Sequence, residues 1–161
     1  MVLAQLLVIK KLQGRSRSRA LAAVGGVFGT AWLVLGLAGY IDGSNVVLSA
    51  AIVILFGAIF AVGETMLSPV SPALVNVLAT DELRGRYNAL SSMVWGMSAI
   101  VAPVSAGPLL GAGLGGVWIV LVAAGTIAAS LVALSLHKLI TPEQDGRTAT
   151  TAPGVLEPAP A

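Results

Sequence analysis

The chain has no cysteine and a single histidine among its 161 residues. Without cysteine there is no disulfide bond and no thiolate metal site. Cysteine usage therefore does not indicate whether the protein faces an oxidising or a reducing compartment. One histidine and dispersed carboxylates predict neither a metal cluster nor a nucleophilic triad. A phosphate-binding loop of the Gly-x-x-x-x-Gly-Lys type is also missing, which argues against an ATP-driven pump subunit. We therefore expect no enzyme activity and no cofactor.

Charge is scarce as well. Charged residues make up 10% of the chain and hydrophobic residues 57%, with a mean hydropathy of +0.93. A soluble domain carries about a quarter charged residues, so this composition predicts a membrane protein whose first partner is the lipid bilayer. The small net charge of +2 does not predict a nucleic-acid partner, because the basic residues flank apolar stretches and form no groove-sized patch.

Four apolar stretches are long enough to cross a bilayer, which takes about 20 helical residues. In lipid, only helices and closed barrels satisfy the hydrogen bonds of the backbone. These stretches lack the alternation of apolar and polar residues that barrel strands show. We therefore predict an all-α membrane protein with four transmembrane helices. Within a transmembrane region of 20–139, the predicted helices cover residues 20–40, 46–79, 87–110 and 117–138.

Prolines predict irregularity in two of these helices. Beyond Pro69 and Pro72, apolar residues continue at helical spacing, so we expect 46–79 to be one helix that is kinked at the prolines. Pro103 and Pro108 in the third helix predict a bent or interrupted helix, of the kind that transporters use to shape a cavity.

Small residues spaced four apart let helix backbones approach closely in lipid. Gly107 and Gly111 have this spacing, as do Ala102 and Ala106. In a chain this rich in alanine and glycine such pairs also arise by chance, so the spacing alone does not establish a contact.

Positive charge falls on one side of the predicted membrane region. If the four helices are threaded through a bilayer, all nine Lys and Arg lie on the same side. By the positive-inside tendency that side is the cytoplasm, which predicts the cytoplasmic (inner) membrane with both ends of the chain inside. Residues 1–19 are then interpreted as the end of a preceding helix plus a basic cytoplasmic loop. The proline-rich residues 140–161 are interpreted as a disordered cytoplasmic tail.

Glu64 is the only ionisable side chain inside any long apolar stretch. A carboxylate at membrane depth costs a few kcal/mol, so it usually has a function or a partner. Counting about 1.5 Å per residue from the loop after Tyr40 puts Glu64 some 27 Å inward, near the inner boundary of the bilayer. There it could pair with Arg84, Arg86 or the arginines of 15–19. We expect a gating or anchoring role ahead of direct proton or substrate coupling, and both hypotheses stay open.

The connection between the second and third helices contains two acids and two arginines: Asp81, Glu82, Arg84 and Arg86. The acidic pair, which follows Thr80, is expected to lie in the first turn of the next helix, and the arginines are expected to fix the topology. The alternative is a set of charge contacts that lock a cytoplasmic gate in one state of alternating access.

Other polar side chains near these helices have two interpretations. Ser68, Ser71 and Asn76 are candidates for a polar path, but hydrogen bonding between helices explains them equally well. His137 lies next to Lys138 at the predicted inner interface, where we expect a solvated side chain.

A series of short motifs begins at Glu64 and continues into the third predicted helix. The segment is Gly63-Glu-Thr-Met-Leu-Ser-Pro-Val-Ser-Pro-Ala-Leu-Val-Asn-Val-Leu-Ala-Thr-Asp-Glu-Leu-Arg-Gly-Arg-Tyr-Asn88, followed by Trp95-Gly96 and Gly107-Pro108. In order and spacing it resembles the major facilitator superfamily, specifically its multidrug-efflux-like members, over about residues 20–138. The resemblance implies helices nine to twelve of a twelve-helix secondary transporter that moves a small-molecule substrate in exchange for protons.

One departure from the family pattern lies in the loop Lys10-Lys-Leu-Gln-Gly-Arg-Ser-Arg-Ser-Arg19, which keeps the arginines but has no acidic residue. The family's substrate path lies between two six-helix halves, so the resemblance implies that N-terminal transporter helices are missing. On that basis the chain alone is not expected to transport. Two other hypotheses are a self-contained four-helix membrane protein with a structural or interaction role, and a small dimeric efflux subunit that uses Glu64 itself.

Overall fold

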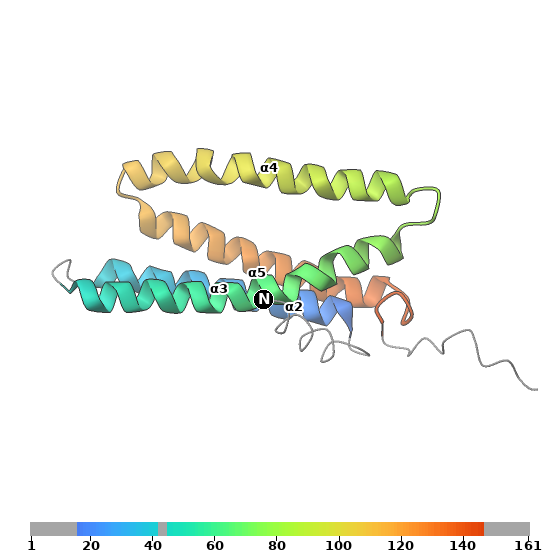
Figure 1. Ribbon diagram of the computed structural model, residues 1–161, viewed down its shortest axis with the longest axis horizontal. Coiled ribbons are helices and arrows are strands. Elements are labelled where there is room, and N and C mark those ends of the chain that lie inside the picture. The colour runs from blue at the N-terminus through green and yellow to red at the C-terminus, as the bar shows by residue number, and fades with distance from the viewer. Residues whose placement is uncertain (1–15, 42–44, 147–161) are drawn as a thin grey trace, which may run out of the picture.

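The computed structural model describes residues 16–41 and 45–146, and all regular structure within them is helical (Figure 1). Four α-helices are joined by short connections, with one turn of 3-10 helix after the first. Their bounds are α2 (Arg17–Leu37), η1 (Ala38–Tyr40), α3 (Val46–Leu78), α4 (Arg84–Gly111) and α5 (Gly115–Leu139). All four α-helices are long and apolar enough to span a membrane, so the predicted all-α fold of an integral membrane protein is confirmed.

Helix α2 is the centre of the packed part of the molecule. It lies against α3 on one side and α5 on the other, whereas α4 runs apart from the other three helices (Figure 1). No residue of α4 is buried. The fold thus consists of a packed α2–α3–α5 cluster and a weakly attached fourth helix.

Aromatic side chains set the register between α2 and α3. The ring centroids of Phe28 and Phe60 are 4.8 Å apart, and those of Trp32 and Phe56 are 5.4 Å apart. The pairs step forward by four residues along α2 and back by four along α3, which is the register of antiparallel helices. Such tilted ring pairs contribute about 0.5–1.5 kcal/mol beyond their buried area.

Glycines allow α2 to approach its neighbours closely. A Cβ at Gly25 would collide with the Ser130 hydroxyl and lie 2.9 Å from the Thr126 carbonyl oxygen, both on α5. On α3, a Cβ at Gly63 would lie 2.7 Å from the ring of Phe28. Gly25 and Gly29 have the four-residue spacing of a small-residue contact, and Gly29 also faces Thr126.

The small-residue pair predicted in the third helix makes no comparable contact. A Cβ at Gly107 or Gly111 would meet nothing within 4 Å. The spacing is present, but α4 has no helix packed closely enough to use it. The close contacts are instead those of Gly25 and Gly63.

The reversal between α4 and α5 depends on Gly113. Its φ of 73° is a left-handed conformation that favours glycine. The Gly113 N–H donates to the Leu110 carbonyl at 3.0 Å, and the Leu114 N–H donates to the Leu109 carbonyl at 2.8 Å. This is the Schellman pattern, which satisfies the last carbonyls of α4 and allows α5 to turn back at once.

Both prolines of α3 lie inside one continuous helix. Figure 1 shows that the second half of α3 changes direction and rises toward the start of α4. Since Pro69 and Pro72 have no N–H to bond the preceding turn, they account for this bend, as predicted. In contrast, α4 runs through Pro103 and Pro108 without interruption or sharp bend, so the irregularity predicted there is not observed.

The start of α4 differs from prediction. Asp81 and Glu82 do not lie in its first turn, because the helix begins at Arg84 and is preceded by Leu83 as N-cap residue without a side-chain cap. The Leu83 N–H donates to the Thr80 carbonyl at 3.0 Å, which closes a separate turn before the helix. The acidic pair belongs to that turn.

Gly25 and Gly26 form a matched pair that tests the packing of α2 on α5. We expect Gly25→Ala to destabilise the protein by about 1–3 kcal/mol, because its Cβ has no room against α5. Gly26→Ala meets nothing within 4 Å, and should be neutral or stabilising by up to about 1 kcal/mol through helix propensity. The measurement is denaturant unfolding of the purified protein in bicelles. Equal free energies of unfolding for the two variants would contradict the packing described here.

Candidate functional site

A groove between α3 and α4 brings several of the predicted residues together with three that were not predicted. Its volume is about 310 Å³. The predicted members are Glu64, Ser68, Ser71 and Pro72 from α3, joined by Leu67 of α3 and by Ser91 and Trp95 of α4. Asn76 and Pro69 are not part of its lining.

Glu64 lies on the exposed face of α3 and has no hydrogen bond or ion pair among the described residues. The aromatic register places it level with Val24 of α2, about 10 Å along the helix axis from Arg17. Glu64 therefore lies just past the middle of α3 on the side of the charged end, and its predicted depth near the inner boundary of a bilayer stays a prediction. The pairing that was suggested with Arg84 or Arg86 is not formed; Arg15 lies outside the described residues.

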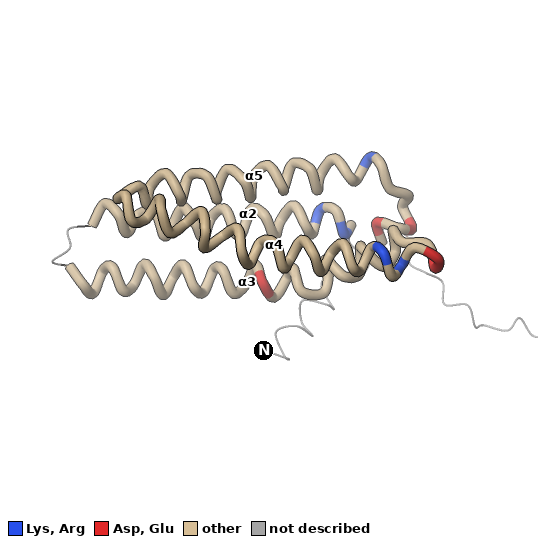
Figure 2. Tube along the Cα trace, turned by 90° about the horizontal axis from the view of Figure 1, so that it is seen from above, with Lys and Arg blue, Asp and Glu red and all other residues tan. Residues whose placement is uncertain are grey.

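The other charged side chains among the described residues lie at one end of the helices. Figure 2 shows the described lysines, arginines, aspartates and glutamates gathered there, with one acidic position, Glu64, farther along α3. One-sided positive charge was the basis of the predicted topology, and among the described residues the fold keeps it on one side.

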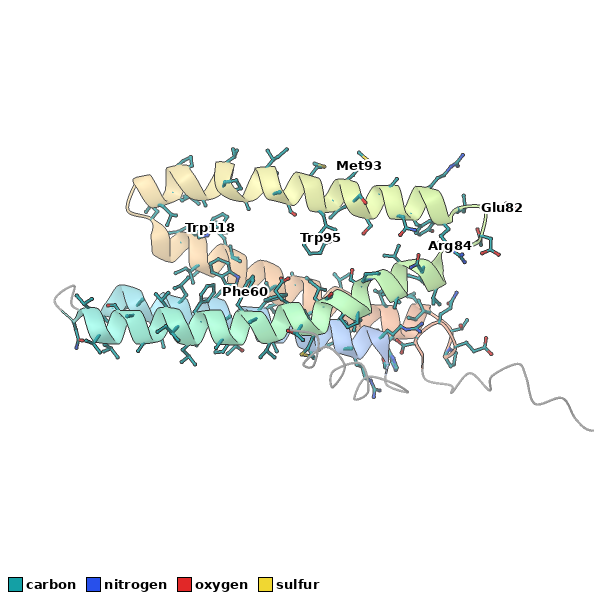
Figure 3. All side chains as sticks on the ribbon, in the orientation of Figure 1. Phe60, Glu82, Arg84, Met93, Trp95 and Trp118 are labelled. Atoms are coloured by element: carbon teal, nitrogen blue, oxygen red, sulfur yellow. The ribbon has the colours of Figure 1, made fainter. Side chains whose placement is uncertain are left out.

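Trp95 is the large side chain that α4 contributes to the groove. In Figure 3 its side chain extends from α4 toward the other helices, whereas Met93 points to the opposite side. A second cavity of about 400 Å³ shares Ser71, Ser91 and Trp95 and continues toward Tyr87. Trp95 was singled out only as part of a family motif, because its approach to Glu64 requires α4 to fold back along α3.

The charged connection before α4 makes local contacts. The Arg84 Nη2 atom lies 2.6 Å from Asp81 Oδ1, and these side chains are 52% and 90% exposed. An exposed pair of this kind contributes about 0–1 kcal/mol. Glu82 and Arg86 are also exposed, and no hydrogen bond or ion pair joins this connection to α2 or α5 among the described residues. The gate lock suggested for these charges stays a prediction.

Asn76 bonds to the neighbouring helix instead of facing the groove. The Asn88 Nδ2 atom donates to Asn76 Oδ1 at 3.4 Å, which joins the end of α3 to the start of α4. This is the alternative interpretation given for Asn76 above, a hydrogen bond between helices.

A second polar cluster was not predicted. Residues 141–146 fold back and carry Asp145, which is fully buried, to the start of α2. The expectation of a disordered tail over 140–161 is therefore wrong for 141–146, and 147–161 lie outside the described residues. We call Ser16, Ser18, His137 and Asp145 the clasp, since together they join the start of α2 to the end of α5.

The clasp satisfies the orphan N–H groups at the start of α2. The Arg17 N–H donates to the Asp145 carbonyl at 2.8 Å, and the Ser18 N–H donates to Asp145 Oδ1 at 2.9 Å. The next N–H, of Arg19, donates to Ser16 Oγ at 3.2 Å. Helix starts need such partners because their first N–H groups have no acceptor within the helix. Asp145 thus caps α2 from a distant part of the chain.

The side chains of the clasp are also paired. Ser16 Oγ donates to Asp145 Oδ2 at 2.6 Å, and His137 Nδ1 lies 3.0 Å from the same oxygen. An ionised carboxylate only accepts, so His137 carries its proton on Nδ1. Ser18 Oγ, 2.9 Å from Ser16 Oγ, donates to it, since the Ser16 proton is used by Asp145. His137 is therefore a bonded member of the clasp, and the expected solvated flank is wrong.

Serine, histidine and aspartate are the residue types of a hydrolytic triad, but the clasp has a different arrangement. Ser18 Oγ lies 3.5 Å from His137 Nδ1, the same nitrogen that faces Asp145. In a triad the serine and the carboxylate contact opposite ring nitrogens, so that the imidazole can accept the serine proton. Ser18 is also fully buried. The clasp is therefore structural and does not form a nucleophile.

Asp145 stays ionised in this setting. Burial alone raises its pKa, but the hydrogen bonds from Ser16, Ser18 and His137 outweigh burial and hold the pKa well below the usual range of a carboxyl. Among residues 16–41 and 45–146, no three histidine, aspartate or glutamate side chains gather closely enough to bind a metal ion.

The lowered pKa of Asp145 predicts acid sensitivity. A carboxyl whose pKa is lower in the folded state contributes stability that is fully present above the unfolded value, about 3.9, and is lost as the pH falls toward the folded value. We expect the thermal midpoint of the native protein to fall steeply below about pH 4, and this fall to be shallower in Asp145→Asn. Glu143→Gln, a change at an exposed acid in the same turn, should keep the native profile. Parallel profiles for the native protein and Asp145→Asn would contradict the assignment.

Comparisons of the chain with protein-family models, with curated proteins and with solved structures give no match.

Proposed function

We propose that the chain forms part of a secondary transporter of the major facilitator type, and that the groove between α3 and α4 is part of its solute path. The observation that carries this proposal is the composition of the groove. It combines the only carboxylate within the predicted membrane spans with serine hydroxyls and an indole. Ionisable residues at membrane depth are expensive and typically mark solute or ion pathways.

The solute that suits this groove is a small amphiphilic cation. The carboxylate of Glu64 supplies a counter-charge, and the face of Trp95 supplies a surface that attracts cations and buries apolar groups. Ser68 and Ser91 add hydroxyls that can orient a polar substituent. A single carboxylate that binds either a proton or a cation also provides a basis for exchange, and we propose that the transporter uses protons in this way.

Two structural features support a part in alternating access. The second half of α3 is bent at prolines, and α4 is not buried against the α2–α3–α5 cluster. Transporters place solute sites at bent or interrupted helices and open them by moving helix groups against each other. In the proposed assembly further helices complete the path opposite Glu64, and the charged connection at Asp81 and Arg84 faces the cytoplasm.

Cation binding tests the proposed site. We expect a lipophilic cation, tetraphenylphosphonium, to quench the fluorescence of the full chain in nanodiscs when Trp32→Phe and Trp118→Phe leave Trp95 as the only tryptophan. Glu64→Gln should weaken binding about tenfold or more, since a close charge pair between partners contributes about 1.5 kcal/mol or more. Glu82→Gln, a change at an exposed acid outside the groove, is the matched control. Equal affinity for the native groove and Glu64→Gln would refute the site.

Proton exchange has a separate readout. If Glu64 exchanges a proton for the cation, binding should release protons into a weakly buffered solution. The release is measured with a pH indicator during titration with the same cation. Glu64→Gln should abolish it. Binding without proton release would leave the groove as a cation site and overturn the coupling.

A further inference from the structure

The clasp lies at one end of the contact between α2 and α5. His137 is in the last turn of α5, and Ser16 and Ser18 stand at the start of α2. Asp145 joins the two, so the charged ends of both helices are held by hydrogen bonds to a single carboxylate. Bonds to a charged acceptor are roughly twice as strong as neutral ones.

A cavity begins one helical turn beyond the clasp. It has a volume of about 270 Å³ and lies between α2 and α5, with one side chain from α3. Leu21 and Ala133, which follow Ser18 and precede His137 by one turn, are at its end near the clasp. Its lining residues are Leu21, Val24, Gly25, Phe28, Leu67, Thr126, Ala129, Ser130 and Ala133.

The far end of the same helix pair is held differently. There Gly36 packs on Ile119. A Cβ added at Gly36 would lie 3.3 Å from the Ile119 Cγ2 atom. In lipid such contacts depend on close packing of small and apolar groups. The two ends of the α2–α5 pair are therefore secured by independent interactions, so one end can open while the other stays packed.

We propose that residues 141–146 act as a strap that closes the α2–α5 cavity at its charged end, and that displacing Asp145 opens this end locally. The strap is attached at three points. Asp145 bonds α2 and His137, its backbone carbonyl accepts from Arg17, and the Arg17 Nη1 atom donates to the Gln144 carbonyl at 2.9 Å. The proposal does not depend on the transport function or on the groove between α3 and α4.

The strap opens by displacement of the turn and not by titration at ordinary pH. The carboxylate of Asp145 faces Ser16, Ser18 and His137, and its pKa is low enough to keep it ionised. The other charged groups of these elements are Arg17, whose guanidinium bonds the turn, and the exposed Arg19, Lys138 and Glu143. A force or a binding partner acting on the segment after α5 would therefore be transmitted directly to the start of α2.

The native chain has no cysteine, so single cysteines report opening without background. Ala133 and Ala123 are both buried on α5, with 8% and 4% exposure, but only Ala133 lines the cavity next to the clasp. We compare maleimide labelling of Ala133→Cys and Ala123→Cys in the full chain in nanodiscs, each combined with Asp145→Ala, Asp145→Asn or Glu143→Gln.

Asp145→Ala should raise the labelling rate of Ala133→Cys by about tenfold or more, as expected when hydrogen bonds to a charged acceptor are lost. Asp145→Asn should give a smaller increase, because an amide oxygen can still accept from Ser18. Glu143→Gln should change neither rate, and Ala123→Cys should stay slow throughout. The proposal is overturned if Asp145→Ala leaves Ala133→Cys unchanged. It is equally overturned if both cysteines accelerate together, because the loss would then be global unfolding.

Discussion

Close approach between helix backbones is the constraint on which the rest of this structure depends. Lipid tails are as apolar as the side chains, so there is no hydrophobic driving force between helices in a bilayer. The helices associate through tight packing and hydrogen bonds instead. Gly25 and Gly63 permit that packing, because any side chain there would collide with α5 or with Phe28. Helix α2 can therefore contact α3 and α5 together, whereas α4 has no such close approach and no buried residue.

The helices themselves could be predicted because their cause is local. An apolar run of about 20 residues in lipid has to satisfy its own backbone, and a helix is the simplest way to do so. The predicted start of α3 coincides with the observed one at Val46, and its predicted end differs by one residue. The start of α4 was less accurate, because a turn ending at Leu83 competes with the acidic cap for the same residues.

The two polar sites differ in how much the sequence revealed. Glu64, Ser68 and Ser71 could be grouped because they occupy neighbouring turns of one predicted helix. Trp95 and the clasp could not be placed this way, because their contacts join residues far apart in the chain. Asp145 lies in a polar, proline-containing segment whose composition favours disorder. Its hydrogen bonds to Ser16, Arg17, Ser18 and His137 nevertheless hold the segment in place. The one usable signal was His137, a titratable ring at a helix end, which has a favourable interaction with a nearby acid.

The distribution of contacts divides the chain into parts with different mechanical properties. Aromatic rings, glycines and the clasp fix α2 to its two neighbours, so these helices form one body. Helix α4 is tied to this body at its ends, by the turn at Gly113 and by the connection before Arg84, with the Asn76–Asn88 bond as a weak additional link. The groove around Glu64 lies on the boundary between these parts. Because the groove is lined by both parts, a movement of α4 against the packed cluster would change the distance between Trp95 and Glu64, and with it the shape of the proposed solute path.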